Sequence, residues 1–113
     1  MLPSQHRLNK RQDIERVFKR GRTFYANNLG LRFGPMDLAK SRFTVVVSLK
    51  VSKKAVARNL LKRRLREIIR RDVLPRLRQN VDGLILTKQP LLKLPFTELK
   101  QLTLELFKKA RLI

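Results

Sequence analysis

Cysteine is absent from this 113-residue chain, and histidine occurs once, at His6. Without cysteine there is no disulfide, no thiolate nucleophile and no cysteine-based zinc site. A single imidazole cannot form a cluster of histidine metal ligands either. Because His6 stands alone in a polar N-terminal stretch, we expect it to be an idle surface side chain.

Long apolar runs are also missing. A membrane-spanning helix needs about 20 consecutive apolar residues, and the uninterrupted apolar stretches of this chain are very short. The first residues, Met1 to His6, lack the apolar core of a secretion signal. We therefore expect no membrane association and a cytoplasmic location.

Acidic residues are scarce, with 8 Asp and Glu against 28 Lys and Arg, so the formal net charge is +20. Apolar residues still make up 42% of the sequence. That combination indicates a folded domain with a cationic exterior rather than a disordered basic tail. Since like charges repel one another in a compact protein and a polyanion relieves the repulsion, nucleic acid is the natural partner.

The few acidic residues do not suggest an active site. Hydrolysis of a phosphodiester by a protein needs clustered carboxylates that hold metal ions, or a histidine-based acid and base pair. The acids are scattered, and Asp13 and Glu15, two residues apart, would point in different directions on a helix. We expect no catalytic residue and no metal site in this chain, which argues against a toxin-like ribonuclease.

The length fits one domain over residues 1–113, of which 1–8 are expected to be flexible. The spacing of Ile14, Val17 and Phe18 predicts a first amphipathic helix. Asn9 is its candidate cap, and Gly21 should end it.

Three extended segments follow from the pattern of apolar residues. Residues 22–33 alternate as a half-buried strand does, and residues 34–37 supply a turn. Residues 43–49 are β-branched and almost continuously apolar, which predicts a strand covered on both faces. Residues 83–87 predict a further strand.

Two more helices complete the predicted fold. One covers about residues 55–74 and ends near Pro75, and the other follows Pro95. The last helix carries an apolar stripe formed by Leu99, Leu102, Leu106 and Phe107. We predict a single α+β domain of order α-β-β-β-α-β-α, with a sheet packed by helices.

The central helix is unusually basic. Between positions 50 and 71 there are ten basic residues and one acid, Glu67. At about 100° per residue, one stripe carries the cations and the opposite side carries leucine and isoleucine. Solvated helix faces usually mix both charges, because like charges four residues apart destabilise a helix. This face is therefore predicted to dock on a polyanion rather than simply to be solvated.

The run from Ser48 to Glu67, which reads SLKVSKKAVARNLLKRRLRE, resembles the signature of the bacterial ribonuclease P protein family. The elements Ser-x-Lys-Val, Ala-Val-x-Arg-Asn and Lys-Arg-x-x-Arg-Glu carry the resemblance. Residues 8–21, with a Phe-Lys-x-Gly exit, resemble the first helix of the family, and residues 82–90 resemble its last strand. Leu60 departs from the pattern, because the family has a basic residue there, and we assign it no RNA contact.

The resemblance implies a ribosomal protein S5 domain 2-like fold and a role as the small protein subunit of a ribonucleoprotein. In that enzyme the RNA subunit carries the Mg²⁺-dependent removal of the 5′ leader from precursor tRNA, and no protein partner is required. The residues that match the family's RNA-subunit contacts are Lys50, Lys53, Lys54, Arg58, Asn59, Lys62, Arg63 and Arg66.

The resemblance also implies a leader-binding cleft between the first helix and the sheet, with Ile14, Phe18 and Phe33 as candidates. Bases of a single strand stack on aromatic rings, each stack being worth about 1–3 kcal/mol. Ile14 cannot stack, and Phe18 fits a core position equally well. Strand register decides which side Phe33 faces.

Two other interpretations fit the composition. A small ribosomal protein would be equally basic and free of cysteine, and only the motif in residues 50–67 argues against it. A DNA-binding helix-turn-helix module would need a short helix just before the basic helix, where residues 43–49 predict a strand.

Overall fold

A four-stranded sheet in the order β1-β2-β4-β3 forms the centre of the molecule. The computed structural model describes residues 2–35 and 40–113. Its strands are β1 (Arg22–Ala26), β2 (Leu29–Pro35), β3 (Arg42–Val46) and β4 (Val81–Thr87). The β1, β2 and β4 strands pair antiparallel, whereas β3 runs parallel to β4.

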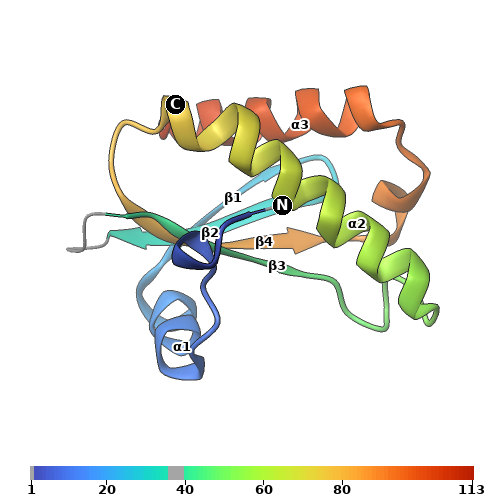
Figure 1. Cartoon of the computed structure of the whole chain (residues 1–113), viewed down its shortest axis with the longest axis horizontal. Coiled ribbons are helices and arrows are strands. Elements are labelled where there is room, and N and C mark those ends of the chain that lie inside the picture. Colours follow the sequence, from blue (N-terminus) through green and yellow to red (C-terminus); the bar gives the residue numbers. More distant parts are fainter. Residues whose placement is uncertain (1, 36–39) are drawn as a thin grey trace.

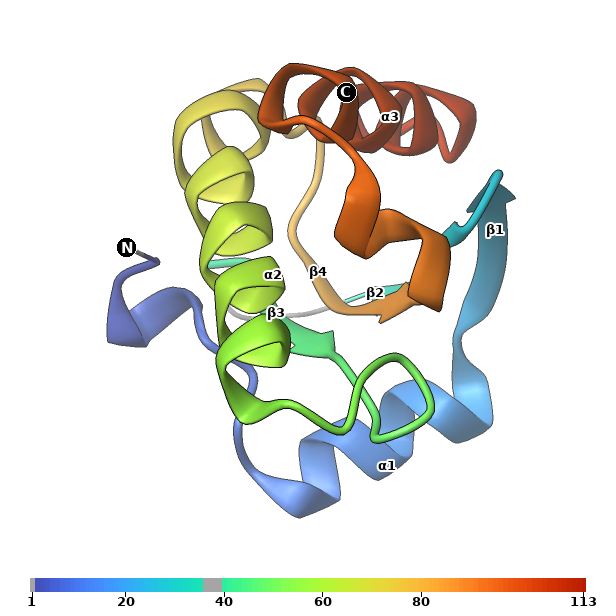
Figure 2. The same cartoon turned by 90° about the vertical axis from the view of Figure 1, so that its right-hand side faces the viewer.

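Helices cover both faces of this sheet. The α2 helix (Ala55–Ile68) and the α3 helix (Phe96–Lys109) lie on one face, and α1 (Arg11–Arg20) lies on the other (Figures 1 and 2). The predicted α+β fold and its element order α-β-β-β-α-β-α are confirmed. The extended segment at residues 22–33, which was predicted as one strand, contains β1 and most of β2, which pair antiparallel. No helix in the part of the chain that the structure describes is long and apolar enough to cross a membrane.

The alternation of side chains along the strands creates two apolar clusters. Leu31 pairs with Ile85, and this side of the sheet belongs to the main core, which includes α2 and α3 residues such as Leu65 and Phe107. The other side carries Leu84, which packs with Leu8 and Val17 in a smaller cluster beneath α1. Each sheet face is therefore apolar where a helix covers it.

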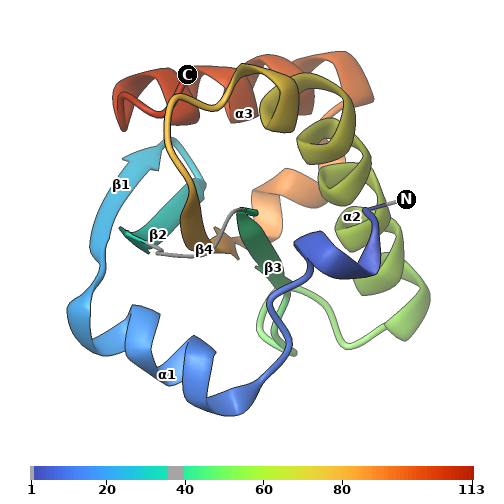
Figure 3. The same ribbon diagram turned by 60° about the vertical axis from the view of Figure 1, so that its left-hand side comes forward.

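The N-terminal segment differs from the prediction. Residues 1–8 were expected to be flexible, but Leu2 and Leu8 are each only 1% exposed, and the Leu8 amide donates to the Phe43 carbonyl at 2.8 Å. Figure 3 shows this segment beside α2, on the way to α1. The prediction is wrong for residues 2–8, because two buried leucines outweigh the polar residues between them.

Several element boundaries also differ. The α1 helix begins after Lys10 without a side-chain cap, so Asn9 is not its cap. Of the turn predicted at residues 34–37, Gly34 and Pro35 belong to β2, and residues 36 and 37 lie outside the described residues. After Ile68 the helical path continues as a wider π turn and then a 3₁₀ turn that contains Pro75.

The β3 strand is not covered on both faces as predicted. It lies at the edge of the sheet, and Phe43 and Val45 are buried while Val46 is 37% exposed. Buried and more exposed residues alternate along β3. The sequence does not reveal this alternation, because the outward-facing residues are β-branched as well.

Candidate nucleic-acid interface

The α2 helix has the two faces that its sequence predicts. Leu61, Leu65 and Ile68 are buried against the sheet and α3. Asn59 and Arg63 are exposed, while Arg58, Lys62 and Arg66 are half-buried. This geometry leaves a continuous basic face on the outside of the helix.

A shallow hollow lies on this basic face, with a volume of about 440 Å³. It is lined by Val56, Asn59, Leu60, Lys62, Arg63 and Arg66. Three cations and one amide thus surround an apolar patch. Cations neutralise phosphate, and an amide offers both a donor and an acceptor to a base edge or a ribose hydroxyl. Leu60, which lacks the charge typical of the family, supplies part of that apolar patch.

The loop before α2 is fixed by Arg58. Its Nη1 donates to the Ser52 carbonyl at 2.9 Å, and the Ser52 hydroxyl accepts from the Lys54 amide at 3.1 Å. The exposed lysines Lys50 and Lys53 lie in this loop. The first turn of α2 holds no acidic residue, so the positive end of the helix dipole adds to the charge of the lysines.

Arg70 continues the basic stripe of α2 along the sequence, but a neighbouring carboxylate offsets its charge. It forms a charged hydrogen bond with Glu67, three residues earlier on the same helical path. This contact is the largest of those that lower the pKa of Glu67 to about 2, so the carboxylate is ionised and offsets the charge of Arg70 at neutral pH. The row that remains available to a polyanion is Arg58, Lys62 and Arg66.

A second candidate surface lies on the α1 side of the sheet. Ile14 and Leu86 pack against the cluster beneath α1, and Phe18, one helical turn after Ile14, is 49% exposed. Phe18 is therefore not a core residue. Arg32 ties the end of α1 to β2, because its Nε lies 3.1 Å from the Val17 carbonyl and 3.0 Å from the Phe18 carbonyl.

Phe33 does not join Ile14 and Phe18. It is 5% exposed and stacks on Phe24 with the ring centroids 5.8 Å apart. Because Phe33 pairs with Gly83, it faces the main core with Ile85, on the side of the sheet away from α1. Its assignment to the cleft was wrong, and the register that decides it is not readable from the sequence.

The sequence analysis missed one aromatic residue on the α1 side, Tyr25. It is 47% exposed. Its neighbour Phe24 packs against the main core, and successive strand residues point to opposite faces. That alternation was the available signal, since one of two adjacent aromatics in a strand must face away from the core.

The sequence analysis also missed an ion-pair cluster that joins α1, β3 and β4. Arg42 Nη2 lies 2.7 Å from Asp82 Oδ2, and Arg42 Nη1 lies 3.0 Å from Asp13 Oδ2. The hydrogen bonds that Arg42 donates to Asp82, together with the charges of both carboxylates, raise the pKa of Arg42. These acids, which are scattered in sequence, meet here to hold α1 against the sheet.

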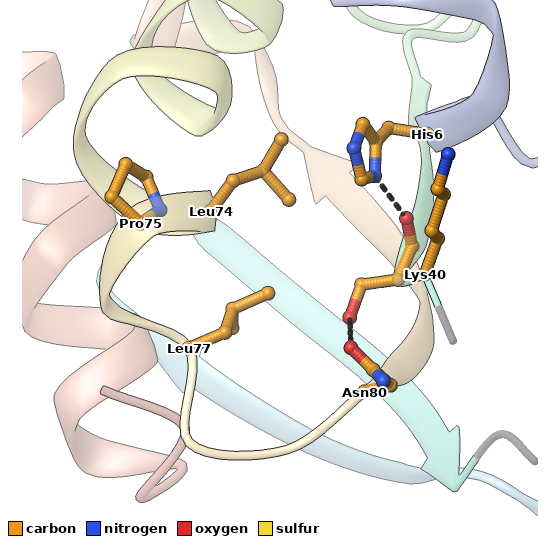
Figure 4. Close-up of a pocket in the computed structure, with 7 residues that line it drawn as sticks. His6, Lys40, Leu74, Pro75, Leu77 and Asn80 are labelled. Carbon is orange, nitrogen blue, oxygen red and sulfur yellow. Dashed lines mark hydrogen bonds between the residues drawn. The ribbon is translucent and has the colours of Figure 1, made fainter. Parts of the chain in front are cut away.

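His6 lines a pocket of about 380 Å³ near the end of α2 (Figure 4). It is half-buried, and its Nδ1 lies 2.7 Å from the Ser41 carbonyl oxygen. The expectation of an idle surface histidine was wrong, because the imidazole pins the N-terminal turn to the start of β3. The described residues that line the pocket with His6 are Lys40, Ser41, Leu74, Pro75, Leu77 and Asn80, and none of these is acidic.

No three acidic or histidine side chains within residues 2–35 and 40–113 gather closely enough to hold a metal ion. The described residues place cations on α2 and its loop, and apolar and aromatic side chains on the α1 side of the sheet.

Comparison with known proteins supports the family resemblance that the sequence shows. The model of the family described as Ribonuclease P matches residues 2–111. The ribonuclease P protein component of Microcystis aeruginosa is 38% identical over 109 residues, covering 89% of this chain and 90% of that protein. Its counterpart in a Synechococcus strain is 36% identical and covers 100% of this chain and 87% of its own length.

Solved structures agree with the fold. The ribonuclease P protein of Thermotoga maritima superposes with a TM-score of 0.82 at 29% identity, covering 91% of this chain and 96% of that one. The Staphylococcus aureus protein has a TM-score of 0.85 at 21% identity, covering 95% and 96%, which supports the fold alone. The sequence match over almost the whole length, joined to the basic α2 helix, shows that this chain belongs to the ribonuclease P protein family.

Proposed function

We propose that this chain is the protein subunit of ribonuclease P, which binds a catalytic RNA and assists it in removing the 5′ leader from precursor tRNA. The observation that carries the proposal is the basic face of α2 and its loop, where Glu67 pairs with Arg70 and cations such as Lys50, Lys53 and Arg63 are exposed. Family membership supports a part in an RNA-processing endoribonuclease and favours it over the ribosomal-protein alternative.

The RNA subunit is proposed to dock on α2 and on the loop before it. Each phosphate that a lysine or arginine neutralises releases condensed counterions, which supplies affinity at low salt. Asn59 lines the hollow beside Lys62 and Arg63. Its side-chain amide is proposed to form a hydrogen bond with a base edge or a ribose hydroxyl. The full set proposed to contact the RNA subunit is Lys50, Lys53, Lys54, Arg58, Asn59, Lys62, Arg63 and Arg66.

The single-stranded leader is proposed to lie on the α1 side of the sheet, along Ile14 and Phe18. Phe18 exposes enough of its ring to contact a base, and Ile14 offers apolar contact. Because only the precursor carries a leader, a grip on it distinguishes precursor from product without slowing product release.

The cutting itself is assigned to the RNA partner, which would also hold most of the Mg²⁺. The described residues of this chain do not form a carboxylate cluster that suits the ion. What the chain supplies is charge, because a protein of net +20 placed between two polyanions lowers their repulsion and raises the local concentration of substrate and cations. We place this activity in the cytoplasm, with no further protein partner.

The test mixes the purified protein with a bacterial ribonuclease P RNA and precursor tRNA at a Mg²⁺ concentration too low for the RNA alone. The expected result is restored 5′ processing by the mixture and none by the protein alone. Cleavage by the protein alone, or no effect of the protein on the RNA, would contradict the proposal.

A further inference from the structure

Tyr25 occupies an unusual place on the α1 side of the sheet. The pairing of Tyr25 with Gly30, of Gly30 with Leu86 and of Leu86 with Val46 sets these four residues in one row across all four strands. Tyr25 and Val46 at the two ends of the row are 47% and 37% exposed. The row is therefore an apolar strip that remains accessible beside α1.

Gly30 leaves the space that the tyrosine ring fills. A Cβ atom at position 30 would lie 2.6 Å from Tyr25 Cε1 and 2.9 Å from Cδ1, closer than carbon atoms approach. It would also lie 3.2 Å from the Leu86 Cβ. The phenol ring thus lies across the backbone of β2 with one face on the sheet, which fixes its orientation and leaves part of the ring accessible.

Two lysines from other elements contact Tyr25, one at its ring and one at its main-chain carbonyl. Lys88 Nζ, just after β4, lies 5.6 Å from the ring centroid, within the range of a cation–π contact. Lys109 Nζ, at the end of α3, donates to the Tyr25 carbonyl at 2.8 Å. Both side chains are exposed, so either ammonium can turn to a phosphate without unfolding any element.

An oriented aromatic ring between exposed cations is the arrangement that binds single-stranded nucleic acid. A base stacks on the ring, and the neighbouring phosphates meet the lysines. Because the cation–π contact of Lys88 lies at an exposed site, where such contacts are weak, a base can take its place over the ring while the ammonium moves to a phosphate.

We propose that Tyr25, resting on Gly30 and flanked by Lys88 and Lys109, is a stacking platform for one base of the single-stranded RNA leader. The proposal rests on the proposed function, since the leader is assigned to the same side of the sheet. Tyr25 supplies from β1 the aromatic stacking that Ile14 cannot supply from α1.

The chain offers a direct probe of this platform, because Tyr25 is its single tyrosine and tryptophan is absent. Intrinsic fluorescence excited in the tyrosine band therefore reports on position 25. Titration with a short single-stranded oligoadenylate should quench this emission, and the quenching should saturate. An abasic ribose-phosphate chain of the same length and charge should leave the emission nearly unchanged. Equal quenching by both chains would overturn the platform.

Binding of the same oligoadenylate to variants tests the stack without fluorescence. Tyr25→Leu should raise the dissociation constant by about 5-fold to 150-fold, the loss expected for one base stack, and Tyr25→Phe should retain most of the affinity. Phe96→Leu removes an aromatic ring that is 37% exposed at the start of α3 and is the matched control, with no change expected. Equal affinity of Tyr25→Leu and the wild-type protein would contradict the proposal.

The holoenzyme separates this inference from the proposed function. With the RNA subunit bound, Tyr25→Leu should weaken the binding of precursor tRNA but not of mature tRNA, because only the precursor carries a leader. If both tRNAs are affected equally, or neither is, the leader platform is wrong while stimulation of the RNA by the wild-type protein still supports the function. If the wild-type protein does not stimulate the RNA, the function itself is wrong.

Discussion

Single side chains in this protein have roles that depend on which neighbours the fold gives them. Glu67 and Arg70 illustrate this at the basic helix, where their pairing removes Arg70 from the available row of cations. Leu60 illustrates the opposite case, since it lines the hollow beside Lys62 and Arg63 although it carries no charge. The available charge of α2 is thus set by pairing as well as by composition.

The ionisation of Glu67 tests this pairing. Its pKa is lowered to about 2, with the hydrogen bond from Arg70 as the largest cause, so a carbon-detected NMR titration should find the carboxyl ionised down to about pH 2. Since the pKa in the folded state is depressed, the pair stabilises the fold above the ordinary glutamate pKa, and this contribution fades as the pH falls toward 2. Arg70→Ala should raise the midpoint toward 4.5. An unchanged midpoint would show that Arg70 does not hold this carboxylate.

Lys62 and Arg63 should carry phosphate contacts. The double variant Lys62→Ala with Arg63→Ala leaves the bond from Arg58 to the loop intact. It should reduce the slope of log affinity against log salt, for binding to the RNA subunit, by about one to two units. The control removes two exposed lysines elsewhere, Lys93 and Lys108, with the same loss of charge. If both variants change the slope equally, only net charge matters, and α2 has no special role.

At the scale of elements, α1 is held to the sheet by a small apolar cluster and one ionic cluster. The side chain of Arg42 is 19% exposed, and those of Asp13 and Asp82 are 14% and 7% exposed. Because the RNA leader is assigned to the surface between α1 and the sheet, the position of this helix determines the shape of that surface.

Removing the central arginine should destabilise the protein markedly. Arg42→Met removes the arginine partner of the largely buried Asp82, while Asp13 keeps its pair with Arg16 at 3.5 Å. Breaking a buried pair costs about 3–5 kcal/mol. Arg11→Ala breaks a pair whose side chains are 92% and 54% exposed, so it should cost about 0.5 kcal/mol or less. The free energies of unfolding in urea measure both. Similar values for the two variants would show that the Arg42 cluster does not fasten α1.

The sequence predicts the helices and strands of this fold better than it predicts the contacts between them. The order of helices and strands and the two faces of α2 follow from hydrophobic period and charge, because these patterns are local. The position of Phe33 depends on the register between β2 and β4, and the burial of Leu2 and Leu8 depends on β3 and α2, so both are tertiary effects. The Arg42 cluster joins residues 29 and 40 positions apart, which no local pattern could indicate.

At the scale of the whole molecule, the net charge governs how stable the isolated protein is. The chain carries +20 after all eight acidic residues have been counted, so the ion pairs described above do not reduce this excess. Like charges on a compact protein oppose folding through mutual repulsion, which salt screens over about 10 Å at 0.1 M. The isolated protein is therefore expected to gain stability from salt and from polyanions.

Thermal unfolding followed by circular dichroism tests this expectation. The midpoint should rise as sodium chloride increases from about 20 mM to about 200 mM, and it should rise further when sulfate replaces chloride at equal ionic strength, since a bound divalent anion stabilises the folded state. A midpoint that falls with added salt would mean that attractive pairs, not repulsion, dominate the surface.

The most direct test of the central claim is single-turnover cleavage of precursor tRNA by a bacterial ribonuclease P RNA at limiting Mg²⁺. The rate is compared without protein, with the wild-type chain and with the Lys62→Ala, Arg63→Ala variant at a subsaturating concentration. We predict a large increase with the wild-type chain and a much smaller one with the variant, which the Lys93→Ala, Lys108→Ala control should not share. Equal stimulation by all three proteins would contradict the claim that the basic face of α2 holds the RNA.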